Sequence, residues 1–147
     1  MVVAIGKGGQ NISAQNAKAH VYGYAVGLDM TRRDLQNDMK KQGRPWCIGK
    51  AFEHSAPISP ITPAAQIADI TQSEISLHVN GQERQRSHIH QLIWNIAETI
   101  EHLSAAWTLQ AGDLIFTGTP AGVGAVVTGD TMVGAITGLG ELHVRMR

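Results

Sequence analysis

The chain has 147 residues, which is long enough for one domain with a sizeable hydrophobic core. Hydrophobic residues make up 43% of it and twelve Lys and Arg balance twelve Asp and Glu, which excludes a disordered chain and a nucleic-acid binder that neutralises phosphates. The single cysteine, Cys47, excludes an intramolecular disulfide, and no apolar run approaches the about 20 residues of a membrane span or resembles a signal peptide. We therefore expect a cytoplasmic protein with neither a nucleic-acid nor a membrane partner.

The first half of the chain predicts short elements followed by a long loop. Residues 1–5 are apolar and β-branched and predict a buried strand, and residues 14–20 predict a short helix. Residues 22–29 predict a second strand, and residues 31–41, rich in charges and helix formers, predict one or two helical turns. Residues 42–63 hold four of the five prolines and predict a rigid, irregular loop. A loop of this length inside a compact domain is usually functional.

The second half predicts a hairpin, one long helix and three more strands. Apolar and polar residues alternate over residues 75–79, and Asn80-Gly81 after them is a strong hairpin signal, so residues 82–86 would form the return strand. Apolar residues at helical spacing predict a helix over residues 89–103. The remaining strands are expected at residues 114–116, 132–133 and 142–146. Many short strands with one long and one short helix indicate a β-rich α+β fold.

Two segments could carry chemistry. The glycine-rich residues 118–124 directly follow an apolar strand, and such a turn either brings backbone N–H groups close to an anion or is purely structural. Residues 28–36 place Asp29 at a strand end, and Arg33 and Gln36 would face the same way if Arg33 opens a helical turn. The carboxylate could then hold a cation while the guanidinium and the amide hold an oxyacid. A solvated, charged helix start is the commoner explanation of such a cluster.

Four other residues are weaker candidates. His88 and His90 could chelate a metal from a strand, but no third ligand is near in sequence, so we expect both to be exposed. His54, in the proline-rich loop, could be a base or merely exposed. Cys47 has no nucleophile motif around it, and we expect a small buried side chain there.

Four segments together resemble the characteristic blocks of the fumarylacetoacetate hydrolase superfamily. They are YGYAVGLDMTRRDLQ at 22–36, PWCIGKAFEHSAPISP at 45–60, VNGQERQ at 79–85 and LQAGDLIFTGTPAGVG at 109–124. Their order and spacing match as well, and the resemblance covers essentially the whole chain. The block D-x-T-x-R-D-x-Q with M-K-K-x-G-x-P-W is most similar to the small acylpyruvate hydrolases, which include fumarylpyruvate hydrolases and a related oxaloacetate decarboxylase.

The resemblance implies a fold, a cofactor and a set of site residues. The fold would be a mixed, β-rich roll that forms a homodimer, with Mg²⁺ or Mn²⁺ bound by three carboxylates and used on 2-oxo acids. Asp29 matches the family's aspartate metal ligand, and Arg33 and Gln36 match the residues that hold the substrate. Lys50 matches the active-site lysine, and Thr119 matches the threonine that lines the pocket.

The resemblance also implies features that residues 1–147 do not contain. The family's other two metal ligands are a Glu-x-Glu pair ahead of the first strand, and its base is a histidine on an N-terminal lid. We therefore interpret residues 1–147 as a catalytic domain without its lid and first metal-ligand segment. Such a chain would be nearly inactive alone and would expose apolar surface at residues 1–5 and around Asp29. An exposed strand edge favours dimerisation or aggregation. Arg32, often a neutral residue in these enzymes, would favour a dicarboxylate or face solvent.

The leading functional interpretation is metal-dependent hydrolysis of the C–C bond of an acylpyruvate, with fumarylpyruvate as the first expected substrate. The products would be pyruvate and a carboxylic acid. A divalent cation would stabilise the departing enolate, Lys50 would add positive charge, and Thr119 would add hydrogen bonds. The alternatives are a 2-oxo-acid decarboxylase or isomerase, acting on oxaloacetate or an intermediate of aromatic degradation, and an inactive truncated relic.

Overall fold

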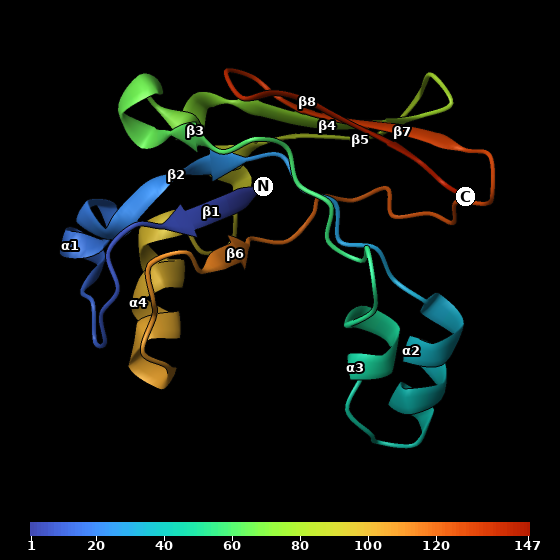
Figure 1. Ribbon diagram of the computed structural model, residues 1–147, viewed down its shortest axis with the longest axis horizontal. Helices are drawn as coiled ribbons and strands as arrows, with labels where there is room; N and C mark the ends of the chain where they lie inside the picture. The colour runs from blue at the N-terminus through green and yellow to red at the C-terminus, as the bar shows by residue number, and fades with distance from the viewer.

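Eight strands form two antiparallel sheets of four strands each (Figure 1). The structure is a computed structural model that describes residues 1–147. The first sheet has the order β3-β2-β1-β6 and consists of β1 (Val2–Ile5), β2 (Val21–Ala25), β3 (Thr62–Pro63) and β6 (Leu114–Phe116). The second has the order β5-β4-β7-β8 and consists of β4 (Glu74–Val79), β5 (Gln82–His88), β7 (Thr131–Ile136) and β8 (Gly140–Arg145).

Short helices connect these strands. The α-helices are α1 (Ala14–Ala17), α2 (Arg33–Lys41), α3 (Cys47–Lys50) and α4 (Ile96–Ala106). The 3₁₀ helices are η1 (Lys18–His20), η2 (Ala64–Gln66), η3 (Ile70–Gln72) and η4 (Ile89–Gln91). None of the helices combines the length and the apolar character that a membrane crossing requires. The β-rich α+β fold expected from the sequence is confirmed.

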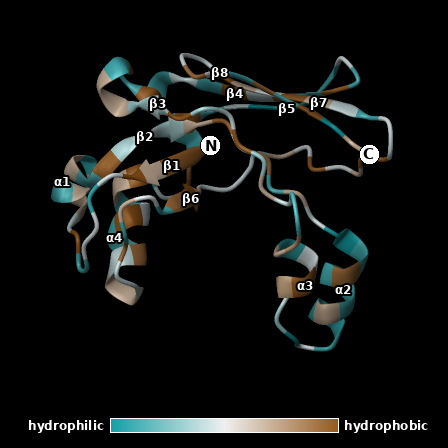
Figure 2. Cartoon of the chain, in the orientation of Figure 1, coloured by the Kyte–Doolittle hydropathy of each residue, from teal (hydrophilic) through white to brown (hydrophobic).

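Strand β1 lies inside the first sheet. It pairs with β2 on one side and β6 on the other, and its four residues are at most 4% exposed. Figure 2 shows that β1 and β6 are both hydrophobic. The expectation of an exposed apolar edge at residues 1–5 is therefore wrong, because a uniformly apolar strand is covered on both faces and paired on both edges.

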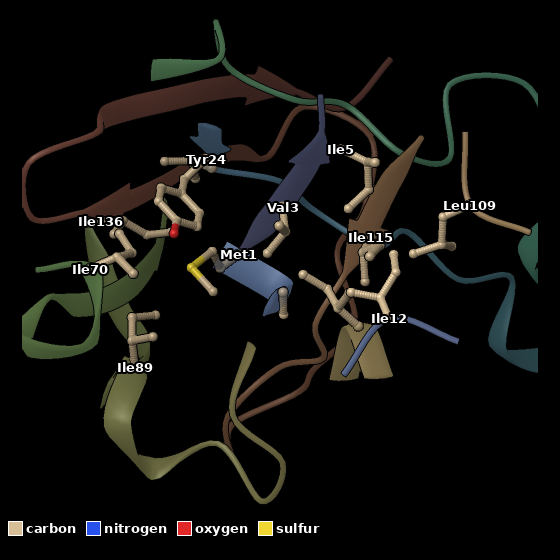
Figure 3. Packing of buried hydrophobic residues seen from close by; sticks show 13 residues of the cluster. Met1, Val3, Ile5, Ile12, Tyr24, Ile70, Ile89, Leu109, Ile115 and Ile136 are labelled. Atoms are coloured by element: carbon tan, nitrogen blue, oxygen red, sulfur yellow. The ribbon is translucent and has the colours of Figure 1, made fainter. Parts of the chain in front are cut away.

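The hydrophobic core links the two sheets. Val3 and Ile5 of β1 and Ile115 of β6 belong to one buried cluster with Ile136 of β7 (Figure 3). Ile100, which has no exposed surface, brings α4 into the same cluster. The core therefore fixes α4 and the second sheet relative to β1, without involving α2 or α3.

The hairpin between β4 and β5 is confirmed. Asn80 and Gly81 have φ angles of 52° and 78°, and positive values at both central residues define the tight turn that suits twisted strands. The return strand continues to His88, beyond the expected residues 82–86. The Asn80 side chain also accepts a hydrogen bond from the backbone of Thr131, which joins the turn to β7.

Strand β5 contains a β-bulge between Glu83 and Gln85. Gln85 lies opposite Leu77 and Glu83 lies opposite His78, so Arg84 is an extra residue without a partner. A bulge bends its strand and redirects the neighbouring side chains. Gln85 is only 9% exposed, and its amide nitrogen donates to the Pro120 carbonyl in the loop that follows β6.

Helix α4 begins only at Ile96, so the helix predicted over residues 89–103 starts too early. Its first residue is set by a capping box, in which the Glu98 backbone N–H donates to Asn95 Oδ1 at 2.9 Å and the Asn95 N–H donates to Glu98 Oε2 at 2.8 Å. Ile93, counted in the helical pattern, is 98% exposed. The capping residues outweigh the apolar spacing as a signal for the start of this helix.

Helices α2 and α3 form an arm, residues 33–50, that stands apart from both sheets (Figure 1). Two segments that run antiparallel connect it to the rest of the chain. The Leu28 N–H donates to the Pro57 carbonyl at 3.1 Å, and the Met30 N–H donates to the Ser55 carbonyl at 2.8 Å. The connection is therefore a pair of hydrogen-bonded strands of chain rather than two loose loops.

The two helices of the arm pack closely at Gly49. A Cβ atom on Gly49 would lie 3.0 Å from the backbone nitrogen and the Cβ of Gln36, so a larger residue would push the helices apart. Helix α3 lies within residues 42–63, where the sequence predicted only an irregular loop. Cys47 is exposed, and the expectation of a buried side chain is wrong, because two helices alone cannot bury both of their faces.

Candidate active site

A cavity of about 1500 Å³ is bounded by the start of the arm, the second sheet and the loop from β6 to β7. Asp29, Arg33, Lys50 and Thr119 all line it, although they are far apart in sequence. Gln36 does not line the cavity; it is buried in α2 with 8% of its surface exposed. The structure therefore brings four of the five expected residues to one cavity and places the fifth next to Arg33.

Cationic side chains outnumber acidic ones around this cavity. The cationic residues are Arg32, Arg33, Lys50, Arg84, Arg145 and Arg147, and the acidic residues are Asp29, Asp34 and Glu53. A cavity lined mainly by one sign of charge concentrates ligands of the opposite sign. The lining therefore favours an anionic ligand.

Lys50 and Asp29 form an ion pair at the cavity wall. Lys50 Nζ lies 2.6 Å from Asp29 Oδ1 and donates a second hydrogen bond to Thr31 Oγ1 at 2.9 Å. The two charged side chains are 33% and 56% exposed, so solvent screens their attraction. The short helix α3 ends at Lys50 and brings this ammonium group to the end of the segment that follows β2.

Arg33 is held by Gln36. Arg33 Nη1 donates to Gln36 Oε1 at 2.5 Å, across the i, i+3 spacing of helix α2. This confirms that the two side chains face the same way, as the spacing predicted. Because Gln36 is itself packed against Gly49 of α3, the arm fixes the direction of the Arg33 guanidinium.

Arg32 also borders the cavity, beside an aromatic ring. Its guanidinium carbon lies 4.4 Å from the centre of the Phe52 ring, and both residues line the cavity. A guanidinium over an aromatic face is attracted to the ring and loses some of its freedom. The second arginine therefore adds positive charge close to Asp29 and Arg33.

Thr119 lies in the glycine-rich loop and is bound by a residue that the sequence reasoning did not single out. Gln85 Nε2 lies 2.9 Å from Thr119 Oγ1, and Gln85 also lines the cavity. The available signal was a polar residue on a strand within VNGQERQ, one of the four resembling blocks. Sequence alone did not show that the bulge turns this residue inward.

The histidines do not converge on the ion pair. His54 lines the cavity and is exposed, with a φ angle of 60°. His88 and His90 are both exposed, as expected, and their rings stack with centroids 5.4 Å apart. They do not line the cavity.

The residues present do not fit a complete divalent-metal site. No group of three or more His, Cys, Asp or Glu side chains is arranged to hold a metal ion. Asp29, the residue matched to a metal ligand, is bound to the ammonium group of Lys50. A hard cation such as Mg²⁺ needs a nearly octahedral set of oxygen ligands, which one carboxylate paired with a lysine does not supply.

The comparison with protein families identifies the class. Residues 1–147 match the model of the fumarylacetoacetate (FAA) hydrolase C-terminal family. The chain therefore belongs to this family, as the four sequence blocks indicated, and its two antiparallel sheets are the fold of that domain.

Two relatives with assigned activities are similar to this chain over most of its length. The chain is 49% identical over 144 residues to a fumarylpyruvate hydrolase of a Ralstonia species, which covers 98% of this chain and 74% of the relative. It is 40% identical over 133 residues to the oxaloacetate tautomerase YcgM of Escherichia coli, covering 90% of this chain and 61% of the relative.

A solved structure is more similar still. The crystal structure of fumarylpyruvate hydrolase from Pseudomonas aeruginosa, in complex with Mn²⁺ and pyruvate, superposes with a TM-score of 0.96 at 61% sequence identity. The match covers 99% of this chain and 62% of that one. The chain thus spans less than two thirds of the length of this relative.

Proposed function

We propose that residues 1–147 form the substrate-binding part of an enzyme that hydrolyses the C–C bond of an acylpyruvate, with fumarylpyruvate as the first candidate. Water would be added across the bond, giving pyruvate and a carboxylic acid. The observation that carries this proposal is the placement of Arg33 and Lys50 on one cavity with an excess of positive charge. Similarity to two fumarylpyruvate hydrolases supports the choice of substrate.

Each residue has a proposed role in binding. Arg33, oriented by Gln36, would form a forked pair of hydrogen bonds with the substrate carboxylate. Lys50 would place its ammonium group near the oxygen that gains charge as the bond breaks, and Thr119 would donate a hydrogen bond there. Removing one such donor typically lowers the rate by about 10²–10³-fold.

We also propose Mn²⁺ or Mg²⁺ as a cofactor, with Asp29 as the ligand that residues 1–147 supply. The support is the Mn²⁺ in the Pseudomonas structure. When bound, such an ion would act as a Lewis acid toward the 2-oxo acid. A homodimer is proposed on the family resemblance, and sedimentation equilibrium at micromolar concentration tests it, because a monomer would contradict it.

The test joins residues 1–147 to the part of the Ralstonia enzyme that the match does not cover. This chimera should convert fumarylpyruvate to pyruvate and fumarate in the presence of Mn²⁺, followed by chromatography of both products. Lys50→Met in the chimera should lower the rate about 10²-fold or more, while Lys40→Met, in the arm and outside the cavity, should not. Failure of the chimera to release pyruvate, with the native Ralstonia enzyme active, would overturn the proposal.

A second candidate is an oxaloacetate tautomerase or decarboxylase. It is favoured by the 40% identity to the Escherichia coli tautomerase. The same chimera should be given oxaloacetate, with the keto–enol ratio followed by absorbance and pyruvate followed by chromatography. A faster reaction with oxaloacetate than with fumarylpyruvate would favour this candidate over the first.

A further inference from the structure

The loop between β6 and β7 has one main point of attachment. It runs through residues 117–130 without a helix or a regular strand. Within residues 118–126, every hydrogen bond of the loop is made with a single side chain, that of Gln85. This loop lines the cavity, and it is thus held by one residue of strand β5, which is not adjacent to it in sequence.

The hydrogen bonds define how the Gln85 amide is oriented. Its Nε2 lies 2.9 Å from Thr119 Oγ1, 2.7 Å from the Pro120 carbonyl oxygen and 3.4 Å from the Ala121 carbonyl oxygen, and its two hydrogens are shared among these three acceptors. Thr119 Oγ1 lies 3.2 Å from Gln85 Oε1 and can donate to it. Backbone carbonyls only accept, so the amide nitrogen must face them and the amide cannot be flipped.

Close packing beside this amide fixes the loop further. Gly122 has a φ angle of 100°, and a Cβ atom on it would lie 2.0 Å from the carbonyl oxygen of Arg84. Arg84 is the extra residue of the bulge in β5, so the bulge and the loop are in contact at the backbone. The loop lies against β5 where only a glycine fits, immediately beside Gln85.

The arrangement also constrains the Thr119 hydroxyl group. A hydroxyl has one hydrogen, and the bond received from Gln85 Nε2 uses one of its lone pairs. Its own hydrogen can then be donated to Gln85 Oε1, over the longer distance of 3.2 Å, or to an oxygen in the cavity. A negatively charged ligand oxygen forms the stronger bond and would take this hydrogen.

We propose that Gln85 is a positioning residue: it holds residues 119–121 against β5 and orients the Thr119 hydroxyl toward a ligand oxygen in the cavity. The identity of that ligand, the carboxylate or oxo group of a 2-oxo acid, rests on the proposed function. The attachment of the loop to Gln85 does not.

The experiment compares three substitutions in residues 1–147. Gln85→Glu keeps the shape but points an acceptor at two carbonyl oxygens, and Gln85→Met keeps the approximate volume without any hydrogen bond. Gln82→Glu is the control, because Gln82 lies on the same strand and is exposed. Urea denaturation of each variant shows whether it folds.

The first measurement is the NMR order parameter of the backbone N–H groups of residues 119 and 121–124. In the unsubstituted chain we expect order parameters of about 0.85, and in both Gln85 variants order parameters below about 0.6, the range of a flexible backbone. The control should leave them unchanged. Unchanged order parameters in a folded Gln85 variant would overturn the proposal.

The second measurement is the affinity for pyruvate, the probe ligand, from NMR titration. Gln85→Met should weaken it about tenfold, which corresponds to about 1.4 kcal/mol. In a chain that already carries Thr119→Val, Gln85→Met should weaken it no further, because Gln85 acts through that hydroxyl. Additive losses would instead assign Gln85 a general structural role and would overturn the positioning role.

The two measurements separate the two proposals. If the unsubstituted chain binds no pyruvate, the proposal that residues 1–147 form the substrate-binding part fails, and the order parameters alone decide whether Gln85 holds the loop. If pyruvate binds but the order parameters do not respond to Gln85, the substrate proposal stands and the positioning proposal fails.

Discussion

At the scale of single residues, the Lys50–Asp29 pair combines a short distance with considerable exposure. The two charged atoms are 2.6 Å apart, yet the side chains are 33% and 56% exposed. Exposed ion pairs contribute about 0–1 kcal/mol to stability, because solvent screens them and two long side chains must be ordered. The pair therefore matters more for the charge of the cavity than for the stability of the fold.

We predict that Lys50→Met changes the free energy of unfolding by less than about 1 kcal/mol. Lys50→Arg, which keeps the charge, should lie within the same limit. Urea denaturation followed by far-UV circular dichroism measures both. A loss of more than about 2 kcal/mol in the Met variant alone would mean that the pair supports the arm, contrary to this expectation.

Asp130 offers a second residue-scale prediction, for the dependence of stability on pH. The Val127 backbone N–H and then the Asn80 amide hold the pKa of this carboxyl below its ordinary value of 3.8. Because the pKa is lowered in the folded state, the charged carboxylate stabilises the fold at every pH above the pKa of the unfolded state. This stabilisation is lost as the pH falls through the pKa of the folded state. The effect therefore belongs to the range below about pH 4.

Asp130→Asn should accordingly lower the melting temperature at pH 7 and have a smaller effect at pH 3. Differential scanning calorimetry of both chains at the two pH values measures the difference. Equal effects at pH 7 and pH 3 would show that the charge of Asp130 does not contribute. Asp113→Asn provides the comparison variant, because the Asp113 carboxylate also accepts from a backbone N–H, that of Gln110, in an exposed turn.

At the scale of elements, the start of α4 depends on its capping box rather than on its apolar pattern. Asn95 and Glu98 satisfy each other's backbone N–H groups, and replacing such a cap by alanine typically costs about 0.5–2 kcal/mol. We predict a loss of about 1 kcal/mol for Asn95→Ala in urea denaturation. Asn37→Ala, at an exposed position inside α2, should leave stability unchanged or raise it slightly, because alanine is the better helix former.

The close contact between β2 and β3 predicts that a side chain at Gly23 would destabilise the first sheet. A Cβ on Gly23 would lie 2.2 Å from the carbonyl oxygen of Thr62, so Gly23→Ala should detach β3 from the edge of the first sheet. We expect a loss of about 1–3 kcal/mol, the usual range for an overpacked position. Gly124→Ala is the control, since a Cβ atom there would meet nothing within 4 Å and the φ of Gly124 is not positive. Equal stability of the two variants would contradict the contact.

Many of the strands and turns could be predicted from the sequence, and those that could not have physical causes. Strands at 75–79 and 114–116, and the turn at Asn80-Gly81, follow from alternation and from turn residues, which are local signals. The start of α4 also has a local signal, the capping box of Asn95 and Glu98, which the apolar spacing from residue 89 obscures. The pairing of residues 1–5 on both edges depends on β2 and β6, and a local pattern does not contain partners so distant in sequence.

The candidate site also contains both features that the local sequence predicts and features that it does not. The pairing of Arg33 with Gln36 follows from helical spacing alone. Asp29 and Lys50 were assigned to one site only through the family resemblance, because they come from separate segments, and their ion pair was not predicted. Gln85 was missed, because its inward direction results from a bulge in β5 that pairing with β4 reveals.

At the scale of the whole molecule, the acidic residues do not gather into a metal-binding cluster. We predict that residues 1–147 alone bind Mn²⁺ with a dissociation constant weaker than about 1 mM, the weak end of the range for oxygen-ligand sites in proteins. Isothermal titration calorimetry with and without Asp29→Asn measures this. Micromolar binding that Asp29→Asn abolishes would show that Asp34, Glu53 or another lining carboxylate completes a site.

Because the arm is separate from the hydrophobic core, a bound ligand would change the local stability of the arm. Arg33 and Lys50 belong to the arm, whereas Thr119 belongs to a loop attached to the second sheet, and the hydrophobic core ties only the latter to β1. A ligand that contacts both would act as a cross-link between two bodies joined by a narrow tether. Its binding free energy would therefore be added to the local stability of the arm, by an amount that grows with the logarithm of its concentration. Hydrogen exchange in α2 and α3 would slow as ligand is added, while exchange in α4 would stay as it was.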